Sequence, residues 1–374
     1  MPRAMTRTPD NRAEMTTAAI KSQHIVAVGG GSAGHVLPAL PILDELLIRG
    51  WRVTYVGTRS GLEQRLTAQL GLTYRGIFSG KLRRYWSWRN FTDLALIAAG
   101  FVQALAMLIA DRPQVVFSKG GFVSLPIVVA AGLLRIPVIA HESDLTPGLA
   151  NRLAAPFLRV LCVSFPETRI PLMRGKTLYA GTPIRRQVLQ GDAQRALQRW
   201  SLDARPLLLV TGGSLGAAPI NEAIRAALPQ LLSTYQVVHV CGAGKTIGVD
   251  QAGYTELEYI DAGWEDLLAA AAIVISRAGA NALFELLALA KLNLLIPLSP
   301  KASRSDQVMN AEFAEGLGMS AVLAESELDT KRLMAALAAL VAQADTYQAA
   351  LRTWQRPDTV AIVVTEIEAL IRAD

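Results

Sequence analysis

Glycine residues at two places in the sequence have a spacing that suits phosphate binding. Gly29, Gly31 and Gly34 match the pattern G-x-G-x-x-G, and residues 212–216 form a second glycine-rich run. Each run follows an apolar segment typical of a buried strand and precedes a segment with helical spacing. Glycine lets backbone N–H groups approach an anion at the start of a helix. Both loops therefore predict a bound phosphate, the alternative being glycines that only permit tight turns.

The strands that follow these loops argue against a nicotinamide dinucleotide as the ligand. Such a site needs Asp or Glu at the end of the next strand, where the carboxylate binds the adenosine ribose. In this sequence the corresponding strands end in Val56-Gly57-Thr58 and in Cys241-Gly242. The loops therefore predict a diphosphate site without a dinucleotide.

Two further chemistries are also not predicted. Gly244, Lys245 and Thr246 are similar to the end of a P-loop, but His239 occupies the position of its first glycine, so the sequence does not predict ATP hydrolysis. Cys162 and Cys241 each lie in an apolar run, as buried reduced thiols do. The histidines are scattered, with no pair at zinc spacing: His24, His35, His141 and His239. We therefore predict no bound metal and no cofactor.

The composition is that of a two-domain globular protein. A chain of 374 residues exceeds one ordinary core and suits two domains of about 150 to 200 residues each. Half of it is apolar and 18% is charged, which indicates large buried sheets or contact with an apolar partner. The net charge of +6 suits phosphate, nucleic acid or a membrane surface without choosing among them. Residues 1–22 lack an apolar core of signal-peptide length, so we expect a disordered tail or a wrongly assigned start, and no export.

Predicted strands and helices alternate in both halves of the chain. Apolar runs predict strands at 24–28, 52–56, 114–117 and 136–140, then at 206–211, 236–241, 257–260, 273–276 and 293–296; helical spacing predicts helices at 38–49, 62–70 and 220–232. This alternation predicts an α/β fold with two doubly wound, Rossmann-like domains. We place them at 23–182 and 183–357. The amphipathic helix expected within 358–374 is not assigned to either domain.

Short motifs along both halves resemble those of the MurG family, the N-acetylglucosaminyltransferases that convert lipid I to lipid II in peptidoglycan synthesis. The motifs are GGSAGHVLP at 30–38, KGGF at 119–122, HESD at 141–144, GTPIR at 181–185, GGSLG at 212–216, SRAGAN at 276–281 with Glu285, and Asp306-Gln307 with Asn310. Each motif alone is weakly specific. Their shared order is what makes the resemblance specific.

The resemblance implies a GT-B glycosyltransferase, in which two Rossmann-like domains face each other across a cleft. It implies that the second domain binds UDP-N-acetylglucosamine and that the first binds lipid I, undecaprenyl-pyrophosphoryl-N-acetylmuramyl-pentapeptide. The substrate-binding residues it implies are Ser32, Ala33, Gly34, Gly120, Gly121 and Asp144 in the first half, and Arg185, Ser214, Ile260, Ala280, Asn281, Glu285 and Gln307 in the second.

The side-chain chemistry of the second half agrees with these roles. The hydroxyl of Ser214 and neighbouring amides suit a donor phosphate, and the guanidinium of Arg185 suits a phosphate or carbonyl oxygen. Glu285 can accept hydrogen bonds from both ribose hydroxyls, although it would also fit an ordinary helix surface. By analogy with the family, the backbone at Ile260 binds uracil and Gln307 contacts sugar hydroxyls.

Two positions depart from the family pattern. Many members have Asn where this chain has Asp144, and an ionised carboxylate cannot donate a hydrogen bond as an amide does. Many also have Asn in the position of Thr182, a change that leaves Arg185 in place. We interpret the change at Asp144, together with Ser143, Thr146, Pro147 and Gly148, as a feature of a sub-type.

Transfer with inversion needs a base that accepts the proton of the acceptor hydroxyl. Our hypothesis is that His35 is this base or orients the acceptor, because it follows a glycine loop at an expected helix start, where the helix dipole would keep the imidazole neutral. A histidine that only packs the loop is the alternative. Glu142 and Asp144 are further candidates for the base.

Residues 81–89 combine four cationic side chains with Leu82, Tyr85, Trp86 and Trp88, and an apolar run follows at 94–110. This composition suits an anionic membrane surface. As a helix, the apolar run would measure about 25 Å against a roughly 30 Å hydrocarbon core, so we expect a buried or surface-lying helix. We predict peripheral attachment to the cytoplasmic side of the cell membrane and no nucleic acid partner, the alternative being a solvated loop before a core helix.

Three other functions fit parts of the pattern. A glycolipid synthase of the same fold and a UDP-sugar 2-epimerase would share the two similar halves. A catalytically silent subunit that binds nucleotide sugar and recruits a partner to the membrane is the non-enzyme alternative. The presence of His35, Arg185, Ser214, Glu285 and Gln307 together argues against the silent subunit.

Overall fold

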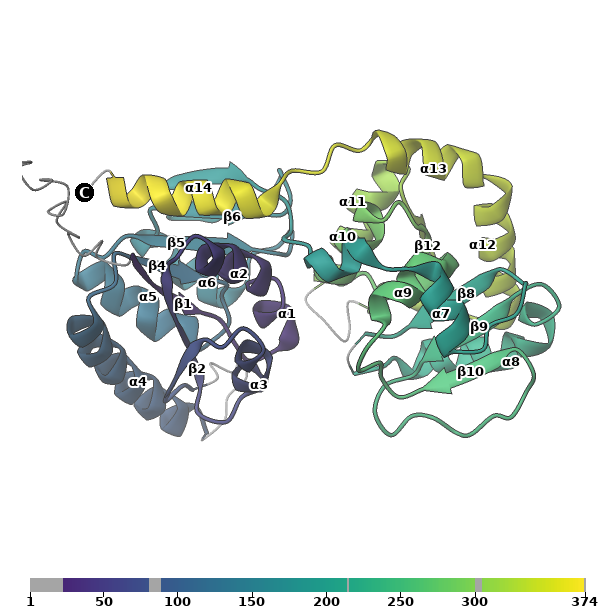
Figure 1. Ribbon diagram of the computed structural model, residues 1–374, viewed down its shortest axis with the longest axis horizontal. Coiled ribbons are helices and arrows are strands. Elements are labelled where there is room, and N and C mark those ends of the chain that lie inside the picture. The colour runs from purple at the N-terminus through teal and green to yellow at the C-terminus, as the bar shows by residue number, and fades with distance from the viewer. Residues whose placement is uncertain (1–22, 81–88, 214, 300–304, 373–374) are drawn as a thin grey trace, which may run out of the picture.

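Two α/β domains, each with a parallel sheet, form the body of the computed structural model (Figure 1). The structure describes residues 23–80, 89–213, 215–299 and 305–372. The chain passes from the first domain to the second, and then returns so that its last helix lies on the first domain. The expected disordered tail, residues 1–22, lies outside the described residues.

The first sheet has seven parallel strands in the order β3-β2-β1-β4-β5-β6-β7. They are β1 (His24–Val28), β2 (Arg52–Thr58), β3 (Thr73–Ile77), β4 (Val115–Ser118), β5 (Val138–Glu142), β6 (Val160–Val163) and β7 (Lys176–Tyr179). All of β1 is buried, and alternate side chains such as Ile25 and Val26 enter separate cores on the two faces. A strand covered on both faces needs such a continuous apolar run. β1 has its predicted bounds, whereas β5 extends past its prediction to His141 and Glu142.

Helices cover both faces of this sheet. They are α1 (Ala33–Val36), α2 (Leu40–Ile48), α3 (Leu62–Ala68), α4 (Arg89–Asp111), α5 (Ser124–Leu133), α6 (Leu149–Ala154) and the 3₁₀ turn η1 (Ala155–Phe157). Leu108 and Ile127 of α4 and α5 pack on one face, and Leu43 of α2 packs on the other. The helix predicted at 38–49 begins at Leu40, and a separate one-turn helix before it carries His35.

The C-terminal helix α14 (Thr359–Arg372), which the sequence left unassigned, packs on the first domain (Figure 1). Its residues Val363 and Ile367 are fully buried in the core that contains α2. An ion pair of 2.7 Å between Lys176 Nζ and Glu366 Oε1 joins it to β7. The first domain is therefore completed by the end of the chain.

The second sheet has six parallel strands in the order β10-β9-β8-β11-β12-β13. They are β8 (Leu207–Thr211), β9 (Gln236–Val240), β10 (Tyr254–Leu257), β11 (Ala271–Ser276), β12 (Leu292–Leu295) and β13 (Ala321–Val322). The helices are α7 (Ala193–Arg199), α8 (Ala218–Leu231), α9 (Trp264–Ala270), α10 (Ala280–Ala288), α11 (Asp306–Gly316), α12 (Thr330–Ala342) and α13 (Ala344–Thr353), with 3₁₀ turns η2 (Arg186–Gln190) and η3 (Glu325–Glu327). The prediction of a strand at 257–260 was wrong, because β10 pairs with β9 from Tyr254 and ends at Leu257.

Helix α4 is longer than its apolar run and lies on the surface of the first domain (Figure 1). Ala104 and Leu108 are buried against the domain, whereas Leu94 is 61% exposed and Val102 is 64% exposed. From Asp93 to Asp111 the helix is long and apolar enough to cross a membrane by length and composition. The inference that the segment is too short to span was therefore wrong, because helix extends beyond the apolar residues. Its packing on the sheet is that of a surface-lying helix.

Candidate active site

Loops that follow strands of both sheets contact one another. The side-chain amide of Asn281, in the first turn of α10, donates to the carbonyl oxygen of Gly34 at 3.2 Å. The hydroxyl of Thr146, in the loop after β5, lies 3.1 Å from the sulfur of Met309 on α11. Parallel α/β sheets bind ligands outside the carboxyl ends of their strands. These contacts therefore bring together the two edges at which a donor and an acceptor would bind.

A cavity of about 300 Å³ lies at the carboxyl edge of the first sheet. Five predicted site residues line it: Ser32, His35, Gly121, Glu142 and Asp144. Phe122 and Leu125 contribute apolar wall. Gly34 and Gly120 belong to the same loops but do not line the cavity, and Ala33 begins α1. The tertiary structure thus gathers residues from the loops after β1, β4 and β5 around one space.

Two glycines of this cavity are required by close packing. Gly31 has φ +86°, and a Cβ there would lie 2.3 Å from a ring carbon of Phe122. Gly121 has φ +84°, and a Cβ there would lie 2.2 Å from the carbonyl oxygen of Gly30. Both positions therefore need glycine for the fit between the two loops, independently of any bound anion.

His35 lines the cavity, but the electrostatic argument made for it from the sequence was wrong. It was expected just after a glycine loop at a helix start, where the dipole disfavours the imidazolium. It lies instead in the last turn of α1, a helix of four residues that ends before α2 begins. A helix of one turn has little macrodipole, so the case for His35 rests on its place in the cavity wall.

Glu142 is occupied by the loop that follows it. One carboxylate oxygen accepts from the backbone N–H of Asp144 at 3.1 Å. The other accepts from the backbone N–H of Gly148 and from the side-chain amide of Asn151, both at 2.9 Å. The residue is 4% exposed. These bonds make Glu142 an organiser of the cavity wall rather than a free base.

Asp144 lies between the two domains, among other acidic groups. Burial, with the neighbouring carboxylates of Glu142 and Asp306, raises the pKa of Asp144 to about 6. A hydrogen bond from Asn310 on α11 and the charge of Lys119 oppose this effect. A carboxyl with such a pKa exchanges its proton near neutral pH. Asp144 therefore has base chemistry available where the domains meet.

Lys119 and His141 form a buried hydrogen-bond network. Neither residue was assigned a role of its own from the sequence, because each appeared only as part of a motif. The ammonium of Lys119 donates to Ser143 Oγ at 2.5 Å and to His141 Nδ1 at 2.8 Å. The other ring nitrogen of His141 donates to the carbonyl oxygen of Gly181 at 2.8 Å, at the start of the passage into the second domain. Burial lowers the pKa of Lys119 to about 8, against the raising effect of two nearby carboxylates, Glu142 among them. The sequence signal was present in the motifs KGGF and HESD, but it did not show that their side chains touch.

In the second domain, the structure pairs two residues that the sequence assigned to separate roles. Arg185 donates to Glu285 Oε1 through Nη2 at 3.1 Å and through Nε at 3.3 Å. Arg185 was predicted to hold a phosphate or carbonyl oxygen, and Glu285 the ribose hydroxyls. The guanidinium of Arg185 orients the carboxylate of Glu285, which balances its charge. The predicted contacts of both residues with the donor stay predictions.

The remaining predicted donor-side residues surround the carboxyl edge of the second sheet. Ala280 and Asn281 form the first turn of α10, where backbone N–H groups are open to an anion. Gln307, in the first turn of α11, accepts from the backbone N–H of Leu298 at 2.9 Å. Ile260 follows β10 and packs its side chain against the domain core. Ser214 lies outside the described residues.

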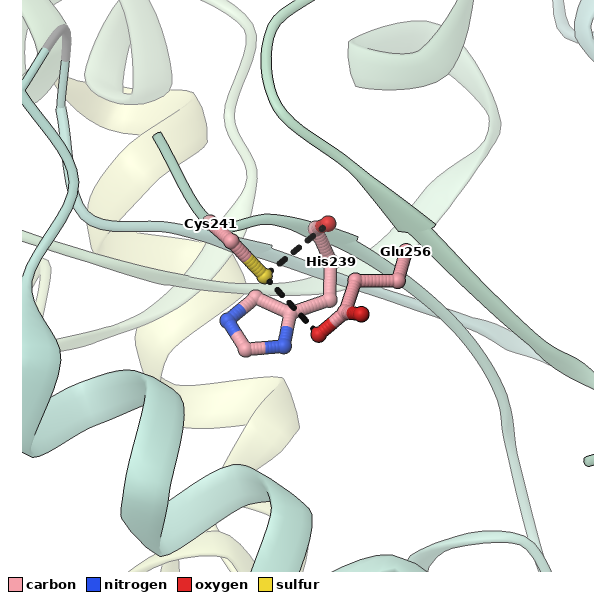
Figure 2. Close-up of side chains that lie close together, drawn as sticks. All are labelled: His239, Cys241 and Glu256. Carbon is pink, nitrogen blue, oxygen red and sulfur yellow. Dashed lines mark hydrogen bonds between the residues drawn. The ribbon is translucent and has the colours of Figure 1, made fainter. Parts of the chain in front are cut away.

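One group of metal-ligand side chains comes together within the described part of the chain. Figure 2 shows His239, Cys241 and Glu256, whose ligand atoms all lie within 4.8 Å of one another. Both ring nitrogens of His239 have hydrogen-bond partners within 3.0 Å. Arg225 donates to Glu256 Oε1 at 2.5 Å and approaches the Cys241 sulfur at 3.6 Å. A guanidinium already neutralises this carboxylate, so the residues present do not fit a metal ion.

Two family models match the chain, one on each domain. The glycosyltransferase family 28 N-terminal domain matches residues 25–162. The glycosyltransferase family 28 C-terminal domain matches residues 207–359. Together they include both glycine loops and all six strands of the second sheet, whereas β7 of the first sheet lies between the two matched ranges.

Curated relatives share close to half of their residues with the chain. A protein of Legionella pneumophila (strain Lens) is 44% identical over 354 residues, which is 92% of this chain and 97% of the relative. A protein of Clostridium perfringens (strain SM101 / Type A) is 46% identical over 321 residues, or 84% and 89%. Each carries the name UDP-N-acetylglucosamine--N-acetylmuramyl-(pentapeptide) pyrophosphoryl-undecaprenol N-acetylglucosamine transferase.

Solved structures agree on the architecture. The crystal structure of Acinetobacter baumannii MurG aligns with a TM-score of 0.72 at 24% identity, covering 93% of this chain and 99% of that one. A putative UDP-N-acetylglucosamine 2-epimerase from Listeria monocytogenes aligns with a TM-score of 0.64 at 12% identity, covering 94% and 96%. The predicted GT-B fold of two Rossmann-like domains is confirmed.

Proposed function

This chain belongs to glycosyltransferase family 28 and, within it, to the MurG transferases, and on that premise we propose that it transfers N-acetylglucosamine from UDP-N-acetylglucosamine to lipid I, forming lipid II. The observation that carries the proposal is the hydrogen bond between Asn281 and Gly34. It joins the first glycine loop to the start of α10. A donor held at α10 and an acceptor held in the cavity would therefore meet at this contact.

On the donor side, the proposal assigns ribose recognition to Glu285. Its carboxylate is oriented by Arg185, and oriented acceptors bind hydroxyl pairs with less loss of side-chain entropy. The backbone N–H groups at the start of α10, near Ala280, suit an electron-rich oxygen of the sugar or diphosphate.

On the acceptor side, we assign the base to His35. In the transfer, the base accepts the hydroxyl proton, the acceptor oxygen bonds to the anomeric carbon, and the bond from that carbon to the UDP oxygen breaks. His35 and Asp144 line the same cavity. The family resemblance implies Asn in the position of Asp144, and an amide cannot accept the proton, so we assign Asp144 to orienting the substrate.

The decisive experiment measures transfer of radiolabelled N-acetylglucosamine to a lipid I analogue. Labelled UDP-N-acetylgalactosamine serves as the matched donor control. We expect labelled lipid product and UDP release that depends on the acceptor. An epimerase would convert the sugar nucleotide without acceptor, and a silent binding subunit would do neither, so either outcome would contradict the proposal.

We also propose that the first domain binds the cytoplasmic surface of the cell membrane through α4. Leu94 and Val102 of this helix are more than half exposed, and Ile97 lines the cavity. An apolar helix surface beside the cavity suits an acceptor whose lipid stays in the bilayer. The basic and aromatic segment 81–88 precedes α4 in sequence but lies outside the described residues.

Vesicle flotation tests this attachment. Anionic phospholipid vesicles should carry the wild-type protein, and Leu94→Asp with Val102→Asp should reduce the floated fraction several-fold. Arg83, Arg84 and Trp86 are replaced in a second variant to test the preceding segment. Unchanged flotation of both variants would contradict attachment through this region.

A further inference from the structure

Lys245, which has no role in the functions proposed above, contacts the second glycine loop directly. Its ammonium donates to the carbonyl oxygen of Leu215 at 2.7 Å and to that of Gly216 at 3.2 Å. Lys245 belongs to the motif Gly244-Lys245-Thr246, which the sequence excluded as a P-loop. The structure places it beside the loop predicted to bind the donor phosphate.

The two loops fit together through glycine. Gly216 has φ +66°, and a Cβ there would lie 1.8 Å from the carbonyl oxygen of Cys241. The loop after β9 turns at Gly244, which has φ +68°, and the side chain of Lys245 then points toward the second glycine loop. The position of the ammonium is thus set by backbone packing between neighbouring strands.

Glu256, one of the residues in Figure 2, belongs to a hydrogen-bond network that holds the backbone at Lys245 in place. Arg225 of α8 donates to Glu256 and, at 2.6 Å, to the backbone carbonyl oxygen of Lys245. The second oxygen of Glu256 accepts from the backbone N–H groups of Ile247 at 2.8 Å and Gly248 at 3.1 Å. Glu256, one of the three residues that resemble a metal site, and its partner Arg225 therefore fix the backbone at Lys245 and just after it.

The charge of Lys245 is available to a ligand. An ammonium has three donors, and two are directed at neutral carbonyl oxygens. Among the described residues, no carboxylate forms an ion pair with it. Arg185, the other predicted phosphate cation, is instead balanced by Glu285. An unbalanced cation at a glycine loop suits a phosphate oxygen and the negative charge that develops on a leaving diphosphate.

We propose that Lys245 binds the diphosphate of the nucleotide-sugar donor and stabilises the departing UDP. The inference rests on the proposed transferase function. Lys245→Met removes the charge and keeps most of the side-chain length. Lys245→Arg keeps the charge, and Lys331→Met removes an exposed lysine on α12, far in sequence from the loop, as the matched control.

The test compares the binding of UDP and uridine by calorimetry. We expect Lys245→Met to weaken UDP binding about tenfold or more, as loss of a charge-assisted hydrogen bond does, and to change uridine binding less than about twofold. Lys245→Arg should retain most of the preference for UDP, and Lys331→Met should match the wild type. The KM for the donor should rise in Lys245→Met, with the acceptor KM unchanged.

Each other outcome has a definite meaning. Equal weakening of UDP and uridine would show that Lys245 only supports the loop, and unchanged UDP binding would show no contact; both overturn this inference alone. A wild-type protein that binds no UDP would overturn the inference together with the transferase function. Melting temperatures of the variants identify any that fail to fold. If Lys245→Met fails to fold, Lys245→Arg tests the inference, because it should still bind UDP in preference to uridine.

Discussion

The two glycine loops have similar backbone features but lie in different chemical surroundings. Each follows the earliest strand of its sheet in sequence, β1 or β8, and positive φ occurs at Gly31 in the first loop and at Gly213 and Gly216 in the second. The first loop borders a cavity whose wall includes the carboxyl groups of Glu142 and Asp144. The second is held by the ammonium of Lys245. The backbone features are shared, so they do not distinguish the loops. The side chains from neighbouring strands decide which loop suits a diphosphate and which suits a hydroxyl-bearing acceptor.

The largest expected effect comes from His35→Ala in the first loop. Loss of a base should lower kcat by about 100-fold or more. UDP affinity, measured by calorimetry, should stay within about twofold, because our proposal places the donor at the second loop. Near-normal turnover in a folded variant would rule out His35 as the base. An equal loss of UDP binding would contradict the assignment of the acceptor to the first loop and of the donor to the second.

Gly216→Ala tests the second loop in the same way. The added Cβ meets the backbone of Cys241 at a positive φ, so the loop must move. We expect at least about a tenfold loss of UDP affinity, since strain of this kind costs of order 1–3 kcal/mol. Gly50→Ala is the matched control, because Gly50 has φ +83° but nothing within 4 Å of its Cβ position. Similar UDP affinities in the two variants would contradict the role of close packing.

Asp144→Asn tests the acidic wall of the first loop through stability. Burial raises the pKa of Asp144 in the folded protein to about 6, from 3.8. Between these values the folded state binds the extra proton, so stability is lost as pH rises from about 4 to 6. The amide should remove that loss and raise the free energy of unfolding by roughly 2 kcal/mol at pH 7. Denaturant titrations at pH 4 and pH 7 check this; an equal effect at both pH values would contradict it.

The smallest expected effect comes from Asn281→Ala, which removes the hydrogen bond between the two regions. One exposed hydrogen bond contributes about 0.5–1.5 kcal/mol. We expect kcat/KM to fall roughly threefold, with UDP affinity little changed. A large loss of UDP affinity would instead make Asn281 a donor ligand, as the sequence resemblance implied. Both are measured in the transfer and calorimetry assays described above.

Strands buried on both faces were predictable because burial on both faces requires an apolar residue at nearly every position. β1 coincides with its prediction, since a strand between two helical layers must be apolar at every position. β10 lies earlier than predicted because Tyr254 and Thr255 pair with β9, whereas Ile260, after Leu257, only packs against the core. Strand pairing at a sheet edge depends on the neighbouring strand, which local sequence does not contain.

The candidate site was predictable as a set of residues but not as a set of contacts. His35, Glu142 and Asp144 do share a cavity, because parallel strands place their following loops at one edge. The bonds that occupy Glu142 and the pairing of Arg185 with Glu285 could not be inferred. Arg185 and Glu285 are 100 residues apart in sequence, and the bonds to Glu142 depend on how the loop after β5 folds back on this carboxylate, so no spacing rule relates these groups.

By itself, the sequence determined the α/β alternation, the two glycine loops and the family, because each depends on local composition or on motif order. Only the tertiary structure decided that α14 belongs to the first domain, that His35 sits in a one-turn helix, and that Lys245 touches the second loop. The physical reason is common to all three. Hydrogen bonds and burial are set by which strands and helices become neighbours, and that choice is made by the packing of the whole chain.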